Sequence, residues 1–255
     1  MKTFAAINVG SYEQTLKIYT ITKNNGIREV DWIRNRLDLG GTFATGKLSH
    51  EVMDELCAVL RNFVSIMEGY RVDDYRACAT SAIRETKNTA IVLDQIMQRT
   101  GVKLDVLSNS EQRFLDYKSI ASRGGFEKII EKGTLVLDIG GGSIQMSLFD
   151  KDKLSATQNM RLGVLRLQEK MSRLNVRPSE NGPLLEELLE AQLSVFRKMY
   201  LKDRVIENII VVDDYISALI LGKLGKVAGS GYLDRDSMAS YMNYLHDHTD
   251  MEIVR

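Results

Sequence analysis

The sequence predicts an α/β protein made of two halves that repeat one order of elements. Each half opens with a strand, a glycine-containing turn and a second strand: INVGSYEQTLKIY in the first half and LDIGGGSIQMSLF in the second. A third extended stretch follows in both halves, and helices then alternate with strands. A structural repeat explains this order more economically than two unrelated domains do.

The first half begins with the apolar run FAAINVG, which predicts a strand that ends at Gly10. Thr15–Ile21 alternates as a half-buried strand does, and a turn at 24–26 leads to a third extended stretch at Ile27–Leu37. From Ser49 to Glu68 apolar residues recur every three to four positions. This spacing predicts an amphipathic helix, with Ser49 as its N-cap.

The remaining elements are expected from the same periodicities and from glycine or proline at their ends. In the first half they are a strand at Tyr75–Thr80, a helix at Thr89–Arg99 ended by Gly101, a strand at Leu104–Leu107 and a helix at Ser110–Ser122. In the second half they are strands at Gly133–Asp138, Ile144–Phe149 and Leu154–Asn159, helices at Gly163–Leu174 and Pro183–Leu201, a buried strand at Ile209–Val212, and helices at Tyr215–Leu224 and Arg235–His246.

The glycine pair inside Arg123–Lys132 is the best candidate for a joint between the halves. We therefore expect one domain over residues 1–125 and a second over residues 126–255. A length of 255 residues suits two small domains, at roughly 100–200 residues per domain.

The composition is that of an ordinary folded protein. Hydrophobic residues make up 44% and charged residues 27% of the chain, which excludes a disordered tail or a fibrous repeat. The 34 Lys and Arg balance 34 Asp and Glu. Because the whole protein then has no field that attracts a polyanion, no nucleic-acid partner is expected, and phosphate recognition would need a local site.

The remaining composition signals favour a cytoplasmic protein. Cys57 and Cys78 are both flanked by apolar residues, as buried free thiols of a reducing compartment are. The three histidines are too scattered in the sequence to suggest a metal cluster. No apolar run reaches the roughly 18 residues of a membrane span, and no signal peptide is recognisable, so no membrane partner is expected.

The two strand–turn–strand segments are where the sequence indicates chemistry. A turn of this kind can direct backbone N–H groups at one phosphate oxygen, and Gly140, Gly141 and Gly142 allow a close approach because they lack a Cβ. Asp138, at the end of the preceding strand, is placed to hold Mg²⁺ against phosphate oxygens. A glycine cluster alone is also typical of a simple turn.

Four segments together resemble the exopolyphosphatase / guanosine pentaphosphate phosphohydrolase family of the actin/sugar-kinase/Hsp70 superfamily: INVGS, ATSAIRETKN, VLDIGGGSIQM and LGVLRL. The resemblance implies two ribonuclease-H-like domains with a cleft between them. It also implies release of terminal phosphate from polyphosphate or guanosine pentaphosphate, with Mg²⁺ or Mn²⁺. Family members usually continue with further helices, so the second domain is expected to be truncated at its C-terminal end.

The resemblance assigns roles to individual residues. Arg84 matches the family's phosphate-binding arginine, and a guanidinium suits phosphate oxygens; a solvated arginine after a strand is the alternative. Asp138 matches the metal-binding aspartate. The matching phosphate loops are Gly10 with Ser11, and Gly140, Gly141, Gly142 with Ser143.

Other positions depart from the family pattern. In the first loop, Asn8, Tyr12 and Glu13 stand where Asp, Asn and Ser are expected. Gln145 replaces a metal-site glutamate, and Gln112 replaces the catalytic base. The segment Asp213-Asp214-Tyr215 replaces a Gly-Gly-Thr turn. An amide cannot accept a proton at neutral pH, so Gln112 can orient water but not deprotonate it. Asp213 and Asp214 could restore charge near the metal or repel phosphate.

Glu111 lies one residue before the base position. On a helix one residue is a rotation of about 100°, so Glu111 is either a displaced base or a solvated, capping carboxylate.

These observations leave three hypotheses open: a hydrolase of this family with impaired activity, a non-catalytic relative that binds polyphosphate or guanosine tetra- or pentaphosphate as a sensor, and a kinase or ATPase of the wider superfamily. The apolar stripe over Leu184–Met199 is expected to be core, with a homodimer interface as the alternative.

Overall fold

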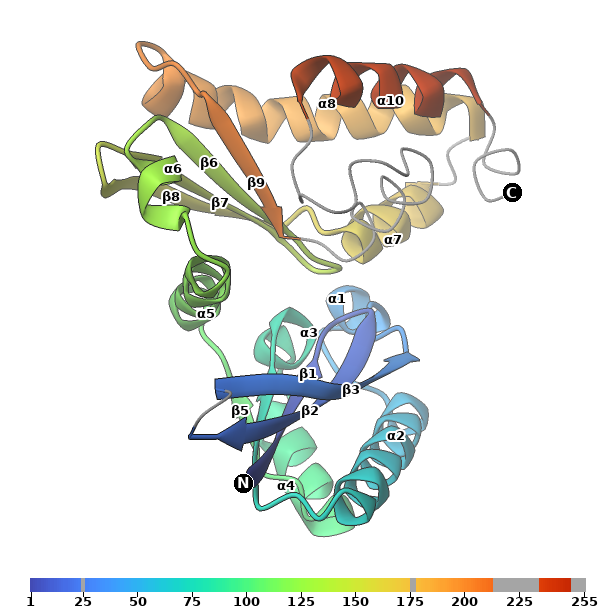
Figure 1. Ribbon diagram of the computed structural model, residues 1–255. Helices are drawn as coiled ribbons and strands as arrows, with labels where there is room; N and C mark the ends of the chain where they lie inside the picture. The colour runs from blue at the N-terminus through green and yellow to red at the C-terminus, as the bar shows by residue number, and fades with distance from the viewer. Residues whose placement is uncertain (24–25, 175–177, 213–233, 249–255) are drawn as a thin grey trace. The chain divides into compact units, whose positions relative to one another are not determined.

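A computed structural model describes residues 1–23, 26–174, 178–212 and 234–248. The chain divides into two compact units, Met1–Val212 and Asp213–Arg255. The first unit contains both β-sheets of the structure (Figure 1). The expected helix at Tyr215–Leu224 and the Asp213-Asp214-Tyr215 segment lie outside the described residues.

The first sheet has five strands in the order β3-β2-β1-β4-β5. They are β1 (Lys2–Val9), β2 (Glu13–Thr22), β3 (Gly26–Arg36), β4 (Asp74–Ala79) and β5 (Leu104–Val106). Strands β1, β2 and β3 form an antiparallel meander, and β1 also pairs with β4 in parallel. The predicted strands of the first half are confirmed.

Two long helices pack beside this sheet: α2 (His50–Gly69) and α4 (Thr89–Thr100). The Ser49 side chain accepts the Val52 N–H, so Ser49 is the N-cap as predicted. Leu56, Leu60 and Phe63 of α2 are fully buried in the core of the first half. Two short helices, α1 (Gly41–Thr45) and α3 (Ser81–Glu85), were not predicted.

The second sheet has four strands in the order β8-β7-β6-β9. They are β6 (Thr134–Ile139), β7 (Ile144–Asp150), β8 (Lys153–Met160) and β9 (Asn208–Val212). As in the first sheet, the first three strands form an antiparallel meander and the first strand also has a parallel partner. The repeated order of strands that the sequence predicts is therefore present.

The prediction that β9 is buried is wrong. Ile209 is 61% exposed and Val211 is 37% exposed. Strand β9 is at the edge of the sheet, and Ile210 and Val212 on its opposite face pack against buried Val136 and Phe149. An apolar run cannot by itself distinguish an edge strand with one covered face from a fully buried strand.

Helices α5 (Asn109–Ser122) and α6 (Phe126–Ile130) connect the two sheets. The ring of Tyr117 on α5 meets Phe149 edge-on at 5.1 Å, and Phe126 on α6 meets the same ring at 5.5 Å. Both helices thus pack on the second sheet. The expected boundary between residues 125 and 126 falls between them and stays a prediction.

The later helices are α7 (Val164–Leu174), α8 (Pro178–Phe196), the π-helix η1 (Arg197–Leu201) and, in the second unit, α10 (Arg235–Asp247). Pro183 was expected to begin a helix, but α8 starts five residues earlier at another proline, and proline is favoured at a first helical position. Phe196 is buried in the core of the second sheet while Met199 is 65% exposed. The homodimer alternative stays a prediction.

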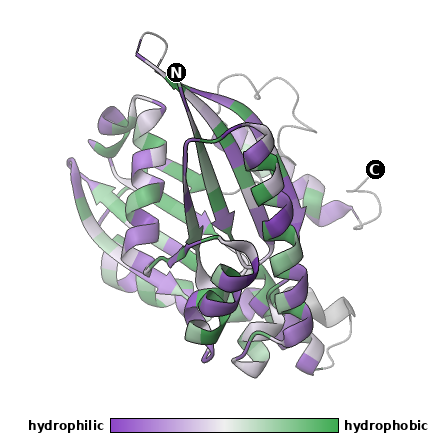
Figure 2. Cartoon of the chain, turned by 90° about the horizontal axis from the view of Figure 1, so that it is seen from below, coloured by the Kyte–Doolittle hydropathy of each residue, from purple (hydrophilic) through white to green (hydrophobic). Residues whose placement is uncertain are grey.

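The helices mix hydrophobic and hydrophilic residues along their length, as Figure 2 shows. Among the described residues, no helix is both long and apolar enough to cross a membrane.

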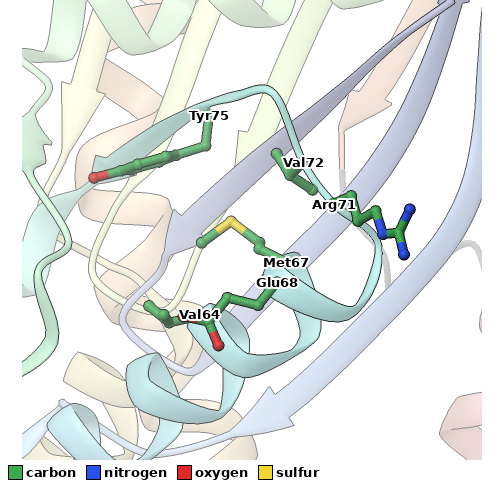
Figure 3. A pocket seen from close by; sticks show the side chains of 6 residues that line it. All are labelled: Val64, Met67, Glu68, Arg71, Val72 and Tyr75. Carbon is green, nitrogen blue, oxygen red and sulfur yellow. The ribbon is translucent and has the colours of Figure 1, made fainter.

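The two cysteines are free thiols. Cys57 is buried and Cys78 is half-buried. A pocket of about 190 Å³ contains none of the predicted site residues; Figure 3 shows its lining, which is Val64, Met67, Glu68, Arg71, Val72 and Tyr75.

Candidate functional site

The two glycine turns close with the same backbone hydrogen bond. In the first, between β1 and β2, the Gly10 N–H donates to the Glu13 carbonyl at 2.9 Å. In the second, between β6 and β7, the Gly140 N–H donates to the Ser143 carbonyl at 2.9 Å. The turns therefore correspond residue by residue, with Gly10 equivalent to Gly140.

The carbonyl groups of the second turn face the start of α7. Gly140 O accepts from the Val164 N–H at 3.2 Å and Gly141 O from the Leu165 N–H at 2.9 Å, and Gly142 O accepts from Arg166 Nε at 2.9 Å. The chain has no cis peptide among the described residues, and in a trans peptide the C=O and the next N–H point in opposite directions. The N–H groups of residues 141–143 consequently point away from the groups that hold those carbonyls.

Among the described residues, the backbone N–H groups of residues 141–143 have no hydrogen-bond partner, and Gly142 and Ser143 are buried. Successive backbone N–H groups in a turn form a concave site for an anion. We refer to the second turn as the cradle, because it is the candidate site for phosphate oxygens.

Close packing against the first half explains why this turn is glycine-rich. A Cβ on Gly142 would collide with Ser81 Oγ and with the Phe43 ring, and a Cβ on Gly141 would lie 3.2 Å from Ser11 Cβ. Ser11 Oγ and Ser81 Oγ are hydrogen-bonded at 2.8 Å, and both serines are buried. The predicted residues Ser11 and Gly140–Ser143 are thus brought together.

We expect Gly163→Ala to disrupt the cradle. A Cβ at residue 163 would collide with backbone atoms, Gly141 O and Ser143 N, which cannot move aside as a side chain can. A loss of about 1–3 kcal/mol in the free energy of unfolding is expected, as for an overpacked core, together with weaker phosphate binding. Gly69→Ala, where a Cβ has open space, is the control for urea unfolding. A Gly163→Ala variant as stable as wild type would contradict this packing.

Arg84 lies at the end of α3, half-buried. Its Nη1 donates to the Leu107 carbonyl at 2.7 Å and to Gln112 Oε1 at 3.3 Å. Its Nη2 is buried and has no hydrogen-bond partner among the described residues. Burial lowers the pKa of the guanidinium, although Glu85 and Asp138 act in the opposite direction. A buried, unpaired donor of this kind suits an anionic ligand.

Asp138 is held by two amides. Its Oδ2 accepts from Gln112 Nε2 at 2.8 Å and from Gln145 Nε2 at 3.0 Å. Gln145 is only 1% exposed, and its Oε1 is buried without a hydrogen-bond partner in the described structure. The three positions that the sequence associates with the base and the metal therefore form one network, which Arg84 joins through Gln112.

Comparisons with known proteins identify the family of this chain. A family model described as the Ppx/GppA phosphatase family matches residues 23–214. The chain belongs to the Ppx/GppA family. It is 27% identical over 154 residues to exopolyphosphatase 1 of Mycobacterium leprae, covering 60% of this chain and 44% of that protein. It is 25% identical over 181 residues to a guanosine-5'-triphosphate,3'-diphosphate pyrophosphatase of Photobacterium profundum, covering 70% of this chain and 35% of that protein.

A solved structure also shares the fold. A crystal structure of an exopolyphosphatase from Cytophaga hutchinsonii matches with a TM-score of 0.72 and 19% sequence identity, covering 90% of this chain and 72% of that one. The predicted two-domain actin-like α/β fold is confirmed. The chain spans less than half the length of the two curated relatives named above.

Glu111, the displaced base of the sequence hypothesis, caps helix α5. Its Oε2 accepts the Ser108 N–H at 2.8 Å, and its own N–H donates to Ser108 Oγ at 3.2 Å. The hydrogen bond from the Ser108 backbone, and then that with the Ser108 side chain, lower the pKa of the Glu111 carboxyl. The structure thus shows the capping alternative for this exposed residue.

Asp116 is a half-buried carboxylate that the sequence analysis did not single out. It lies on α5 four residues after Gln112, one helical turn further on. Its Oδ2 is buried and has no hydrogen-bond partner among the described residues. Burial, and then the negative charge of Asp138, raise the pKa of Asp116 to about 7, against a lowering by Arg113. The sequence signal that could have identified Asp116 is its position four residues after Gln112 on the same helix.

Two oxygens of this network fit a magnesium or manganese ion. The described residues contain no group of three or more His, Cys, Asp or Glu side chains suited to a metal. Mg²⁺, however, is generally held by one or two carboxylates together with substrate phosphates. The Asp138 carboxylate and the unpartnered Gln145 Oε1 supply oxygen ligands of that kind. Asn8, the other altered metal position besides Gln145, is exposed on β1.

Proposed function

We propose that this chain hydrolyses the terminal phosphoanhydride bond of polyphosphate or of guanosine pentaphosphate, at a rate that its substitutions reduce. The observation that carries the proposal is the set of three unpaired backbone N–H groups at residues 141–143. The names of the two curated relatives support these substrates. Free thiols and the absence of a spanning helix among the described residues support a cytoplasmic location.

In the proposed complex the terminal phosphate lies in the cradle formed by the second turn. The backbone N–H groups of Gly141, Gly142 and Ser143 would donate to its non-bridging oxygens. Arg84 would use its unpaired Nη2 for the same phosphate or its neighbour. Such preorganised donors stabilise the charge on the transferring group, which is the main task of a protein in phosphoryl transfer.

The reduced rate follows from Gln112. Its Nε2 is bound to Asp138 and its Oε1 to Arg84, and a neutral amide does not accept a proton from water at neutral pH. The loss of a positioned general base typically costs about 10²–10⁴-fold in rate. Gln112 would still orient the attacking water.

We also propose that Mg²⁺ or Mn²⁺ accompanies the phosphate chain, held by Asp138 and Gln145 Oε1. A bound cation would offset charge on the phosphate oxygens. Because Asp138 is the one carboxylate in this set, the affinity for the free ion is expected to be weak.

A second candidate function is a non-catalytic sensor of polyphosphate or guanosine tetra- or pentaphosphate. The observation that favours it is the double amide contact with Asp138 Oδ2. This contact occupies the carboxylate without a metal and leaves the phosphate cradle unchanged. Such a site would bind phosphate chains without turnover.

The deciding experiment is phosphate release from long-chain polyphosphate with Mg²⁺, measured beside calorimetric binding of the same chains. Turnover that requires Arg84 supports the hydrolase. Binding without release supports the sensor, and absence of both contradicts the two functions together.

Arg84→Ala should weaken polyphosphate binding by about ten-fold or more, because a charge-assisted hydrogen bond to the ground-state anion is lost. The measurement is the Kd by calorimetry with and without Mg²⁺. Arg76→Ala is the matched control, since Arg76 is an exposed arginine on the neighbouring strand β4. Unchanged affinity in the Arg84→Ala variant would remove Arg84 from the site.

A further inference from the structure

Arg166, in the first turn of α7, connects the phosphate cradle to the first half of the chain. Its Nε donates to the Gly142 carbonyl at 2.9 Å, and its Nη2 donates to Glu85 Oε2 at 2.8 Å. Its guanidinium lies over the Phe43 ring, 4.0 Å from the ring centroid. The side chain is only 20% exposed. One planar group therefore has three fixed contacts.

The contact with Gly142 determines the direction of a cradle donor. The Gly142 carbonyl and the Ser143 N–H belong to one trans peptide, so a hydrogen bond that fixes the carbonyl also fixes the N–H. Glycine allows this peptide to rotate more freely than other residues would. Rotation would turn a carbonyl oxygen, in place of an N–H, toward the phosphate, and the oxygen would repel the anion.

We propose that Arg166 is a positioning residue that keeps the Ser143 N–H directed at the bound phosphate. It does so through the Gly142 carbonyl, while Glu85 and Phe43 hold the guanidinium in place. This inference rests on the proposed phosphate site and goes beyond it, because Arg166 acts on the backbone and not on the phosphate itself.

The chemistry of the side chain explains why arginine suits this role. A guanidinium presents N–H groups at fixed angles from different nitrogens, so it can bind Gly142 O and Glu85 at once and still stack on Phe43. A lysine ammonium keeps the charge and can pair with Glu85. It lacks the planar fork that makes both hydrogen bonds in a defined direction.

The test compares three variants with wild type: Arg166→Lys, Glu85→Gln and Arg161→Lys. Arg161 is the matched control, since it also pairs with Glu85, at 3.2 Å, but is 72% exposed, and no hydrogen bond joins it to Gly142 in the described structure. The probe is inorganic tripolyphosphate, with binding measured by calorimetry without metal. The Tm of each variant is measured in parallel.

We expect Arg166→Lys to weaken tripolyphosphate binding by about ten-fold or more, the effect of one charge-assisted hydrogen bond, with a Tm close to wild type. Glu85→Gln should weaken binding less than Arg166→Lys, because the Gly142 contact remains. Arg161→Lys should bind as wild type does.

Equal losses of affinity in the Arg166→Lys and Glu85→Gln variants would overturn the inference, because the ion pair alone would then explain Arg166. Wild-type affinity in the Arg166→Lys variant would overturn it as well, while leaving the phosphate site intact. If wild type itself does not bind tripolyphosphate, the proposed function is wrong, and the inference that rests on it is wrong as well.

Discussion

Restoring acids at three positions, with Gln112→Glu, Gln145→Glu and Asn8→Asp together, should raise Mg²⁺-dependent phosphate release at least ~100-fold, the lower end of what a general base contributes. Glutamate at 112 can accept a proton from water, and the other two changes add negative charge for the cation. Release from long-chain polyphosphate is measured against Mg²⁺ concentration.

The structure also predicts that the thermal stability of the single variant Gln112→Glu depends on Mg²⁺. The Gln112 amide nitrogen lies 2.8 Å from Asp138 Oδ2, so a carboxylate there would face another carboxylate, and the two would resist ionising together. We expect this single variant to have a lower Tm without Mg²⁺ and to recover with it. Gln98→Glu is the matched control, because Gln98 also donates to an aspartate, but on the exposed side of α4.

No gain in phosphate release by the triple variant, with polyphosphate binding intact, would contradict the assignment of Gln112 to the base position. It would favour the sensor function.

Asp116→Asn should make the protein more stable at pH 8 by on the order of 2–4 kcal/mol, at about 1.4 kcal/mol for each pKa unit. The carboxyl pKa of about 7 in the folded state, raised by burial and by Asp138, is far above the value near 3.9 expected in the unfolded chain. Between these values the folded state binds more protons, so the contribution of Asp116 to stability falls as pH rises from about 4 to 7.

The measurement is the free energy of unfolding by urea between pH 4 and pH 8 for wild type and the Asp116→Asn variant. The difference between them should be near zero at pH 4 and grow with pH. Asp105→Asn, at an exposed aspartate, is the control and should give no such growth. A difference that stays constant with pH would show that the pKa of Asp116 is the same in the folded and unfolded states.

Much of the fold is predictable from the sequence because the signals are local. The alternation in Thr15–Ile21 and the glycines at 10 and 140–142 identify the two hairpins, and both are present. The apolar spacing between Ser49 and Glu68 identifies α2. In each case the spacing of apolar residues within one element predicts which side chains are buried, so no tertiary information is needed.

The features that were not predicted depend on contacts between different elements of the structure. The exposure of Ile209 follows from the place of β9 at the sheet edge, which no local pattern reports. Whether Glu111 caps its helix or reaches the site depends on its two hydrogen bonds with Ser108. The raised pKa of Asp116 requires the neighbouring Asp138, which comes from another element. The family pattern identified Gln112 and Asp138, and the structure adds that they touch.

The matched geometry of the two turns bears on how such a protein can change during evolution. Both close with the same hydrogen bond from the first residue to the fourth, yet of their four aligned positions they share one residue type, the glycine at 10 and 140. A cradle made of peptide groups depends on the conformation of the turn and not on acidic or basic side chains. Under the proposed function, the acid at position 112 has no backbone substitute, so its replacement would lower turnover and leave phosphate binding in place.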